Sequence, residues 1–547
     1  MKKIIKQLSV LTLAGLLTTS AIGCNTGNTP QAGDQKLNVY ICNQGYRTAG
    51  VEALLDSFAK QDWVKNKYPN LEIMTPTINN QTDYAVTKIK APKTNDFDIL
   101  FTPGTQIITL YEKNAKGEYL LEDLTESVYK QEVLDRPGVT FEQAMDSVVR
   151  ETGYAYTAKG ASTVQYFGVP WVTGASGIIY SEEILARYGY TDGKTPNTTD
   201  ELLQLCEDIK NRPEDSGNSS GFSFINASGY YSALPHEWWA QYDGVEAYKN
   251  FWEGKYTDSR GTSYSNKIFD LKGRLKALEV IDESVKYENG YYDLENQNAG
   301  DFMTRQATLL KGQYAMMVCA DWYDTEMALS KEVLEAEGVD THTIKLMPKP
   351  VISALIEKLD TVNDDATLSK VVAAIDAGET SYDGVSDKDF KRVQEARGVY
   401  QTGGTSHEVV VPAKANDKDI AIDFLKFMAT KTAQEAYMIA TMGQNLPFAY
   451  DYQNMSDDVK AAISPLQESR LNKYYNNSYP IQVLPSTRFF PLVRYGGLTA
   501  VEVQSTNYNT IFAVPGNTIT PQKIFDDTKT KWTEAVFNFA LLQAGLD

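Results

Sequence analysis

Two short segments of the sequence combine tryptophan rings with carboxylates. Trp238 and Trp239 are followed by Asp243, and Asp321 directly precedes Trp322. An aromatic ring covers apolar C–H surface, and a carboxylate accepts strong, charge-assisted hydrogen bonds from hydroxyl groups. The five residues are therefore candidate contacts for a hydroxyl-rich ligand. Adjacent residues on a helix point about 100° apart, so at most one of the two neighbouring tryptophans is expected to meet a ligand while the other packs in a core.

Catalytic and cofactor motifs are largely missing from the sequence. The His-Glu pairs at 236–237 and 407–408 both lack the second histidine of the zinc-protease motif HExxH. The segment 217–221 reads GNSSG, which matches the GxSxG pattern of serine hydrolases, but it lies in a polar loop without the preceding strand that a nucleophile elbow needs. Cys42, Cys206 and Cys319 are widely spaced and are expected to be buried, inert thiols. We expect no catalytic residue, no metal site and no cofactor.

The length and the charge of the chain exclude several classes of protein. Its 547 residues are enough for two or more domains, and 42% hydrophobic with 22% charged residues is typical of a globular protein. The formal net charge of −19 argues against a nucleic-acid partner, which requires a basic face. It argues equally against docking of the folded body on anionic lipid.

The N-terminal residues have the pattern of a processing signal. Lysines at positions 2, 3 and 6 precede an apolar run over 8–17 that is too short to span a bilayer. The sequence Ala21-Ile22-Gly23-Cys24 resembles a bacterial lipobox, although that pattern favours leucine in place of Ala21. We predict a lipoprotein signal peptide over 1–23, lipid attachment (palmitate) at Cys24 and a flexible tether over 24–36. The alternative is an ordinary secretory signal that leaves Cys24 free.

Hydrophobic periodicity indicates an α/β lobe at the start of the mature chain. Strands are expected over 37–41, 71–74 and 97–101, with helical segments between them, an order that favours a largely parallel sheet. Thr198 is placed as the N-cap of a later helix, with Glu201 completing a capping box. Further long helices are expected over 199–211, 271–287, 352–359, 366–377, 418–428 and 432–442.

The loops that follow strands are the natural place for a ligand. In open α/β sheets, ligands bind beyond the carboxyl ends of the strands, which here precede the loops 43–46, 102–106 and 402–407. Amide and hydroxyl groups there can pair with ligand hydroxyls, and glycines let backbone N–H groups approach closely. The candidate contacts in these loops are Gln44, Tyr46, Thr105, Gly404 and Thr405.

Four segments, in order along the chain, carry a resemblance to one family. They are 96–104, 169–202, 310–322 and 403–427, and they include Val169-Pro170-Trp171 before an apolar strand and the run LKGQYAMM before Asp321-Trp322. These segments resemble the extracellular solute-binding proteins of ABC importers, of the sugar-binding, maltose-binding-protein-like family. The sequence departs from the family pattern at Ser181, where asparagine is usual, and at Thr199, where tryptophan is usual.

The resemblance implies an α/β, two-lobed periplasmic-binding-protein-like fold of type II, with lobes joined by a hinge of crossing strands. The N-terminal lobe would comprise 37–172 and 402–448, and the C-terminal lobe 173–350 and 449–547. Residues 351–401 exceed the usual pattern and would form a helical insertion near the hinge. Trp171 lies at the proposed crossover, where it is a candidate ligand contact or packs the hinge.

The resemblance also implies a function. The protein would be a monomeric, non-enzymatic lipoprotein at the bacterial cell surface, on the outer face of the cytoplasmic membrane or facing the periplasm. It would be attached to the membrane only by its lipid. It would capture a carbohydrate, an oligosaccharide by its length and aromatic content, and pass it to ABC permease subunits. The alternatives are a surface glycan hydrolase, since paired carboxylates meet in space and not in sequence, a glycan-adhesion lipoprotein, and an importer component for a non-sugar solute.

Overall fold

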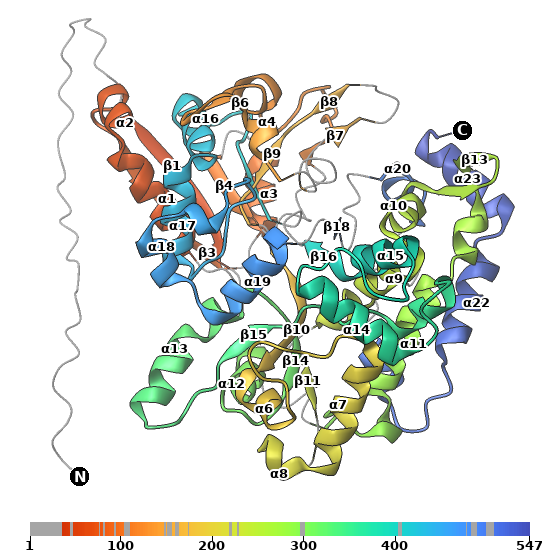
Figure 1. Ribbon diagram of the computed structural model, residues 1–547. Coiled ribbons are helices and arrows are strands. Elements are labelled where there is room, and N and C mark those ends of the chain that lie inside the picture. Colours follow the sequence, from red (N-terminus) through yellow and green to blue (C-terminus); the bar gives the residue numbers. More distant parts are fainter. Residues whose placement is uncertain are drawn as a thin grey trace, which may run out of the picture.

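The computed structural model contains two α/β lobes, each with its own sheet and hydrophobic core (Figure 1). It describes residues 35–43, 48–75, 77–79, 82–91, 95–102, 110–146, 149, 156–158, 163–172, 174–217, 221, 223–226, 229–295, 301–402, 407–476, 479–482, 490–498 and 508–546.

The first lobe is built on a mostly parallel sheet. Its strands are β1 (Lys36–Asn43), β2 (Glu72–Met74), β3 (Thr77–Asn79), β4 (Ile99–Thr102), β9 (Gly168–Pro170) and β17 (Glu408–Val410). The strand order is β2-β1-β4-β17-β9, with β3 also paired to β1. The first four strands pair in parallel, whereas β17 returns late in the chain and inserts antiparallel between β4 and β9. This insertion means that the lobe is completed only after the chain has passed through the second lobe.

The second lobe has a smaller, mixed sheet. Its strands are β10 (Ser176–Ser181), β11 (Phe224–Asn226), β14 (Met316–Ala320) and β15 (Ile344–Leu346), in the order β11-β14-β10-β15. Strand β10 runs antiparallel to both of its neighbours. Because β10 leads away from the first lobe, β14 returns toward it, and the residues after β14 therefore reach the seam between the lobes.

Helices cover both sheets. Those of the first lobe are α1 (Ala49–Lys60), α2 (Asp62–Lys67), α3 (Thr82–Lys90), α4 (Phe141–Ala144), α16 (Lys418–Met428), α17 (Lys431–Ala440) and α18 (Asp457–Ala462). Those that follow β10 are α6 (Glu182–Arg187), α7 (Thr199–Asn211), α8 (Pro213–Ser216), α9 (Pro235–Asp243), α10 (Val245–Glu253), α11 (Gly273–Val285), α12 (Phe302–Leu310), α13 (Tyr323–Ala336), α14 (Asp365–Asp376) and α15 (Asp387–Gly398). The C-terminal helices are α19 (Pro465–Asn476), α20 (Pro491–Arg494), α21 (Asn509–Phe512), α22 (Pro521–Lys531) and α23 (Glu534–Ala544).

Short strand pairs lie outside the two sheets. They are β5 (Glu132–Val133) with β6 (Arg136–Thr140), β7 (Tyr156–Thr157) with β8 (Val164–Gln165), β12 (Lys255–Asp258) with β13 (Gly261–Tyr264), and β16 (Val399–Thr402) with β18 (Tyr479–Gln482).

Several local predictions can be compared with the structure. The helix predicted over 199–211 is α7, and the Thr198 hydroxyl accepts a hydrogen bond from the Glu201 N–H at 3.2 Å, as an N-cap should. The Glu201 carboxylate accepts from the N–H of Asn197 at 2.7 Å, one residue earlier than a capping box requires. The α-helix predicted over 352–359 is wrong, because Ser353–Lys358 forms a 3₁₀ helix. The three internal cysteines are buried as predicted, and burial raises the pKa of Cys206 and of Cys319 to about 12.

The segment 351–401 packs into the second lobe. Leu368 and Val371 of α14, and Phe390 and Val393 of α15, are buried in the same core cluster as Ile178 of β10. The chain then passes into the first lobe between β16 and β17. It returns to the second lobe between α18 and α19, and α19 packs against β15 of that lobe. Within the described ranges, no helix is both long enough and apolar enough to cross a membrane.

Candidate binding site between the lobes

Trp322 extends from the second lobe to the seam. It follows the fully buried strand β14 and is the N-cap of α13, so the strand end and the helix start together fix its backbone. The ring is half-buried and packs against the core of the first lobe. Its centroid lies 5.6 Å from the ring of Tyr230, in the 3₁₀ turn after β11, and 6.2 Å from the ring of His407. The structure thus brings residues from the ends of three strands into one aromatic cluster.

The first lobe contributes His407 and Trp171 to this cluster. Glu408 pairs with Pro170 in the β17–β9 ladder, so the residues flanking that pair, His407 and Trp171, become neighbours with ring centroids 5.7 Å apart. The indole N–H of Trp171 donates to the Thr102 carbonyl at 3.4 Å. Trp171 is 3% exposed and His407 is 8% exposed, and burial lowers the pKa of His407 to about 4. The imidazole is therefore neutral at pH 7 and presents no charge to the seam.

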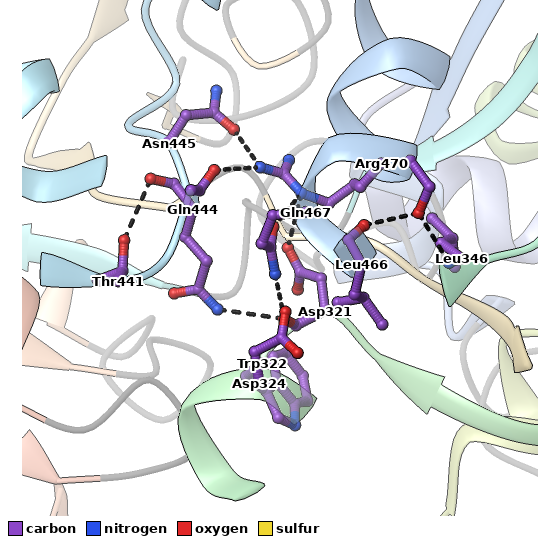
Figure 2. A network of polar contacts seen from close by, with 12 residues as sticks. Asp321, Trp322, Asp324, Leu346, Thr441, Gln444, Asn445, Leu466, Gln467 and Arg470 are labelled. Carbon is purple, nitrogen blue, oxygen red and sulfur yellow. Dashed lines mark hydrogen bonds and ion pairs between the residues drawn. The ribbon is translucent and has the colours of Figure 1, made fainter. Parts of the chain in front are cut away.

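Asp321 lies in a buried polar network that joins the two lobes (Figure 2). Its carboxylate is 3.5 Å from Nε of Arg470 on α19, and the two side chains are 2% and 3% exposed. The Asp321 carbonyl accepts from the side-chain amides of Gln467 at 2.6 Å and Gln444 at 3.3 Å, and Arg470 donates to Asn445 at 2.8 Å. Gln444 and Asn445 follow α17 of the first lobe, whereas Asp321 ends β14 of the second. The lobes are therefore joined here by the Asp321 carbonyl and by Arg470, whose guanidinium is paired with the Asp321 carboxylate.

The other predicted tryptophans lie deeper in the second lobe. Trp238 and Trp239 are 1% and 2% exposed and belong to the core cluster of that lobe. Trp238 donates to the Pro350 carbonyl at 3.0 Å, and Trp239 donates to the Asp243 carboxylate at 3.0 Å. Burial raises the pKa of Asp243 to about 6. The structure brings Trp239 and Asp243 together on α9 as the spacing suggests, and it places them among core side chains, so their contact with a ligand stays a prediction.

The remaining predicted contacts, Gln44, Tyr46, Thr105, Gly404 and Thr405, lie outside the described residues, as does Cys24. The strands beside them are described. Parallel strands β1 and β4 end at Asn43 and Thr102, and β17 begins opposite Thr102. These strand ends lie at the edge of the first sheet where Trp171 and His407 are found.

Three residues of the seam were not predicted from the sequence. Tyr230 follows the carboxyl end of β11, a signal that the rule for post-strand loops could have used. His407 was considered only as half of a metal motif, although it lies in the loop 402–407. Arg470 gave no local signal, because its partner Asp321 is far away in the sequence.

A cavity also lies away from the aromatic cluster. It measures about 660 Å³ and lies in the second lobe, between β15, the helices α14 and α15, and α19. Its wall includes Lys345, Asp376, Glu379, Arg397 and Glu468. The seam is the better candidate for a ligand, because residues of both lobes meet there at the strand ends. The described part of the chain holds no group of three or more His, Cys, Asp or Glu side chains that could bind a metal ion.

Two lobes that meet over strand ends define the class of solute-binding proteins, and solved structures share this architecture. The GacH receptor of Streptomyces glaucescens, studied unliganded and with acarbose, aligns with a TM-score of 0.51 at 14% identity over 92% of this chain and 98% of that chain. A chitin oligosaccharide binding protein aligns with a TM-score of 0.51 at 15% identity over 91% and 98%. The bacterial solute receptor AcbH aligns with a TM-score of 0.50 at 11% identity over 92% and 100%. These similarities confirm the predicted two-lobed fold.

The sequence comparison gives the family. Residues 54–464, well over half of the 547-residue chain, match the family described as "Bacterial extracellular solute-binding protein". The chain belongs to this family, which confirms the resemblance found in the sequence. A search of curated proteins finds no match. Membership in an extracellular family implies a location outside the cytoplasm, at the cell surface or facing the periplasm.

Proposed function

We propose that the protein captures a carbohydrate, an oligosaccharide, between its lobes and delivers it to an ABC permease in the membrane. The observation that carries this proposal is Trp322: a half-buried ring that leaves one lobe, packs on the other, and adjoins the rings of Tyr230 and His407. Aromatic faces suit the C–H patches of sugar rings. The names of the structural neighbours, which refer to acarbose, a chitin oligosaccharide and β-D-galactopyranose, support the same ligand class.

Capture would use closure of the lobes and no covalent chemistry. A solute that touches both lobes binds more tightly to the closed arrangement than to an open one, and it shifts the population toward closure by that difference in affinity. Trp322 would supply a stacking face at the seam. Asp321 would act indirectly, because its carboxylate already faces Arg470 and fixes the backbone from which Trp322 projects. The polar groups for the sugar hydroxyls would come from the post-strand loops that carry Gln44, Tyr46, Thr105 and Thr405.

The remaining parts of the proposal concern the surroundings of the protein. We infer that a lipid on Cys24 holds a monomer at the outer face of the cytoplasmic membrane and that 24–36 acts as its tether. The closed, loaded form would be the one that the permease recognises. The net charge of −19 supports attachment through lipid alone, because an acidic body is repelled by anionic headgroups.

Calorimetry with the purified protein tests the ligand class. A panel of mono- and oligosaccharides, peptides and metal ions is titrated into the protein, and reducing ends are assayed after the incubation. We expect saturable binding of at least one glycan, with oligosaccharides bound more tightly than monosaccharides, and an unchanged amount of reducing sugar. Binding of peptides or metal ions without any response to a glycan would reject the sugar assignment, and release of reducing sugar would favour a hydrolase.

A further inference from the structure

A second set of polar contacts joins the lobes, away from the network around Asp321. Arg494, at the end of α20, donates a hydrogen bond from Nη2 to Oε1 of Glu112. The hydroxyl of Tyr495 donates to the same carboxylate oxygen at 3.2 Å, and the hydroxyl of Tyr156 donates to the other oxygen at 2.9 Å. One carboxylate thus accepts three donors.

These residues come from different lobes. Leu492 and Val493, which precede Arg494 on α20, are buried in the core cluster of the second lobe. Tyr111, which precedes Glu112, and Tyr156 are buried in a core cluster of the first lobe. The hydrogen bonds of Arg494 and Tyr495 to Glu112 therefore exist only while the lobes are close together.

Ring contacts reinforce the ion pair. The guanidinium of Arg494 lies 4.7 Å from the ring centroid of Tyr156 in the first lobe and 4.9 Å from that of Tyr495 beside it. A planar guanidinium can stack on aromatic faces while its edge donates to a carboxylate, which a lysine cannot reproduce. The Arg494 side chain is 8% exposed, so it lies between the lobes and not on the outer surface.

The carboxylate half of the pair remains open to water. The Glu112 side chain is 48% exposed, in contrast to the 2% of Asp321 in the other network. Water can replace the hydrogen bonds of Glu112 when the lobes separate, so breaking this contact costs far less than exposing a fully buried pair. A contact of this kind can hold a closed state without making it permanent.

We propose that Glu112, Arg494, Tyr156 and Tyr495 form a clasp between the lobes that determines how tightly the protein holds its solute. This inference rests on the proposed capture of a solute between the lobes and adds the contact that regulates it. When the clasp forms, the closed arrangement is favoured and the solute leaves slowly. When the clasp is weakened, the open arrangement gains population. The apparent affinity then falls in proportion to the fraction of molecules that are closed.

The test measures the distance between the lobes without any solute. Fluorophores are attached to cysteines introduced at Asp62 on α2, whose side chain is 97% exposed, and at the exposed Glu534 on α23. The two helices lie on opposite sides of the molecule in Figure 1. Cys24 is replaced by serine, and the other three native thiols are buried, so only the introduced cysteines react. Single-molecule energy transfer then gives the ratio of closed to open molecules.

The variants are Glu112→Gln, Arg494→Lys, their combination, and the matched control Glu122→Gln. Glu122 pairs with Lys418 at 2.8 Å within the first lobe, so the control removes the same charge from an ion pair that does not join the lobes. We expect Glu112→Gln and Arg494→Lys each to lower the closed-to-open ratio about three- to tenfold. The combination should lower it no further than the larger single effect, since both changes break one contact. Glu122→Gln should leave the ratio unchanged.

An unchanged ratio in both clasp variants, or an equal fall in Glu122→Gln, would overturn the clasp. Additive effects of the two substitutions would also overturn it, because they would mean that the residues act separately. Thermal melts confirm that each variant is folded. Since no solute is present, the result does not depend on the ligand class, and failure of the clasp is distinguishable from failure of the sugar assignment.

Discussion

The lobes meet through two polar networks that differ in burial. Around Asp321 and Arg470 both partners are 2–3% exposed, and the chain crosses between the lobes nearby. Around Glu112 and Arg494 the carboxylate is half exposed. The first network is suited to a pivot that stays intact, and the second to a contact that breaks and reforms. Burial thus separates the part of the interface that should persist from the part that should open.

Removing the pivot arginine should have the largest effect. Arg470→Met leaves the Asp321 carboxylate buried without its cation, which costs about 3–5 kcal/mol in comparable cases. We expect that loss in the free energy of unfolding, measured by urea denaturation at pH 7. The matched control is Arg260→Met, since Arg260 pairs with Asp258 at 2.8 Å but is 82% exposed. Its effect should stay below about 1 kcal/mol. Equal effects of the two substitutions would show that burial does not distinguish the networks.

Acid should lower the free energy of unfolding through protonation of His407. The folded pKa of His407 is lowered to about 4, so the unfolded chain binds a proton first as the pH falls below its ordinary value of about 6.5. The contribution of this residue to stability is therefore fully present above about pH 6.5 and is lost as the pH falls toward 4, by about 2–3 kcal/mol.

His407→Gln should remove that pH dependence while retaining a neutral polar side chain. Unfolding free energies of the variant and the parent are compared between pH 4 and 8. The buried His236 of the second lobe, whose pKa is lowered to about 3, is present in both proteins, so the acid sensitivity that it adds is the same in each. An unaltered pH profile in His407→Gln would mean that the imidazole is protonated freely in the folded protein.

Loss of the ring at Trp322 should weaken solute binding. Trp322→Ala removes the proposed stacking face, and we expect the dissociation constant for the bound glycan to rise about 10- to 100-fold, in the range of aromatic contacts in other sites. Trp63→Ala is the matched control, because Trp63 is also half-buried against the first core but lies on α2. Calorimetry gives the dissociation constant of each variant, and only that of Trp322→Ala should rise. An equal loss of affinity in the two would indicate a general loss of stability.

The smallest effect is expected at Tyr230. Tyr230→Phe keeps the ring that lies 5.6 Å from Trp322 and removes only the hydroxyl. If the ring alone contributes to the aromatic cluster, the affinity should change by less than about threefold, which is below the net value of one hydrogen bond. A larger fall in the same calorimetric titration would show that the hydroxyl contacts the solute directly.

Local signals in the sequence predicted the ends of individual helices and strands. Long-range packing decided which of their side chains are buried. The helix α7 was predicted with both ends, because Thr198 caps its start and Arg212-Pro213 ends it. Trp322 could be placed at a strand end from the apolar run before it. In contrast, α9 is buried almost entirely, since α10, α11, α15 and the 3₁₀ helix at 353–358 pack around it. A sequence pattern shows one face of a helix and cannot show that Trp238 and Trp239 are both enclosed.

A crystal structure of the protein purified from its native source, with the solute that it carries, would show where the solute binds. We expect a saccharide between the lobes, with a sugar ring against Trp322 and hydrogen bonds from loops of both lobes. A saccharide or another solute bound in the cavity of about 660 Å³ between β15 and α19, with none at the seam, would show that the seam is not the binding site.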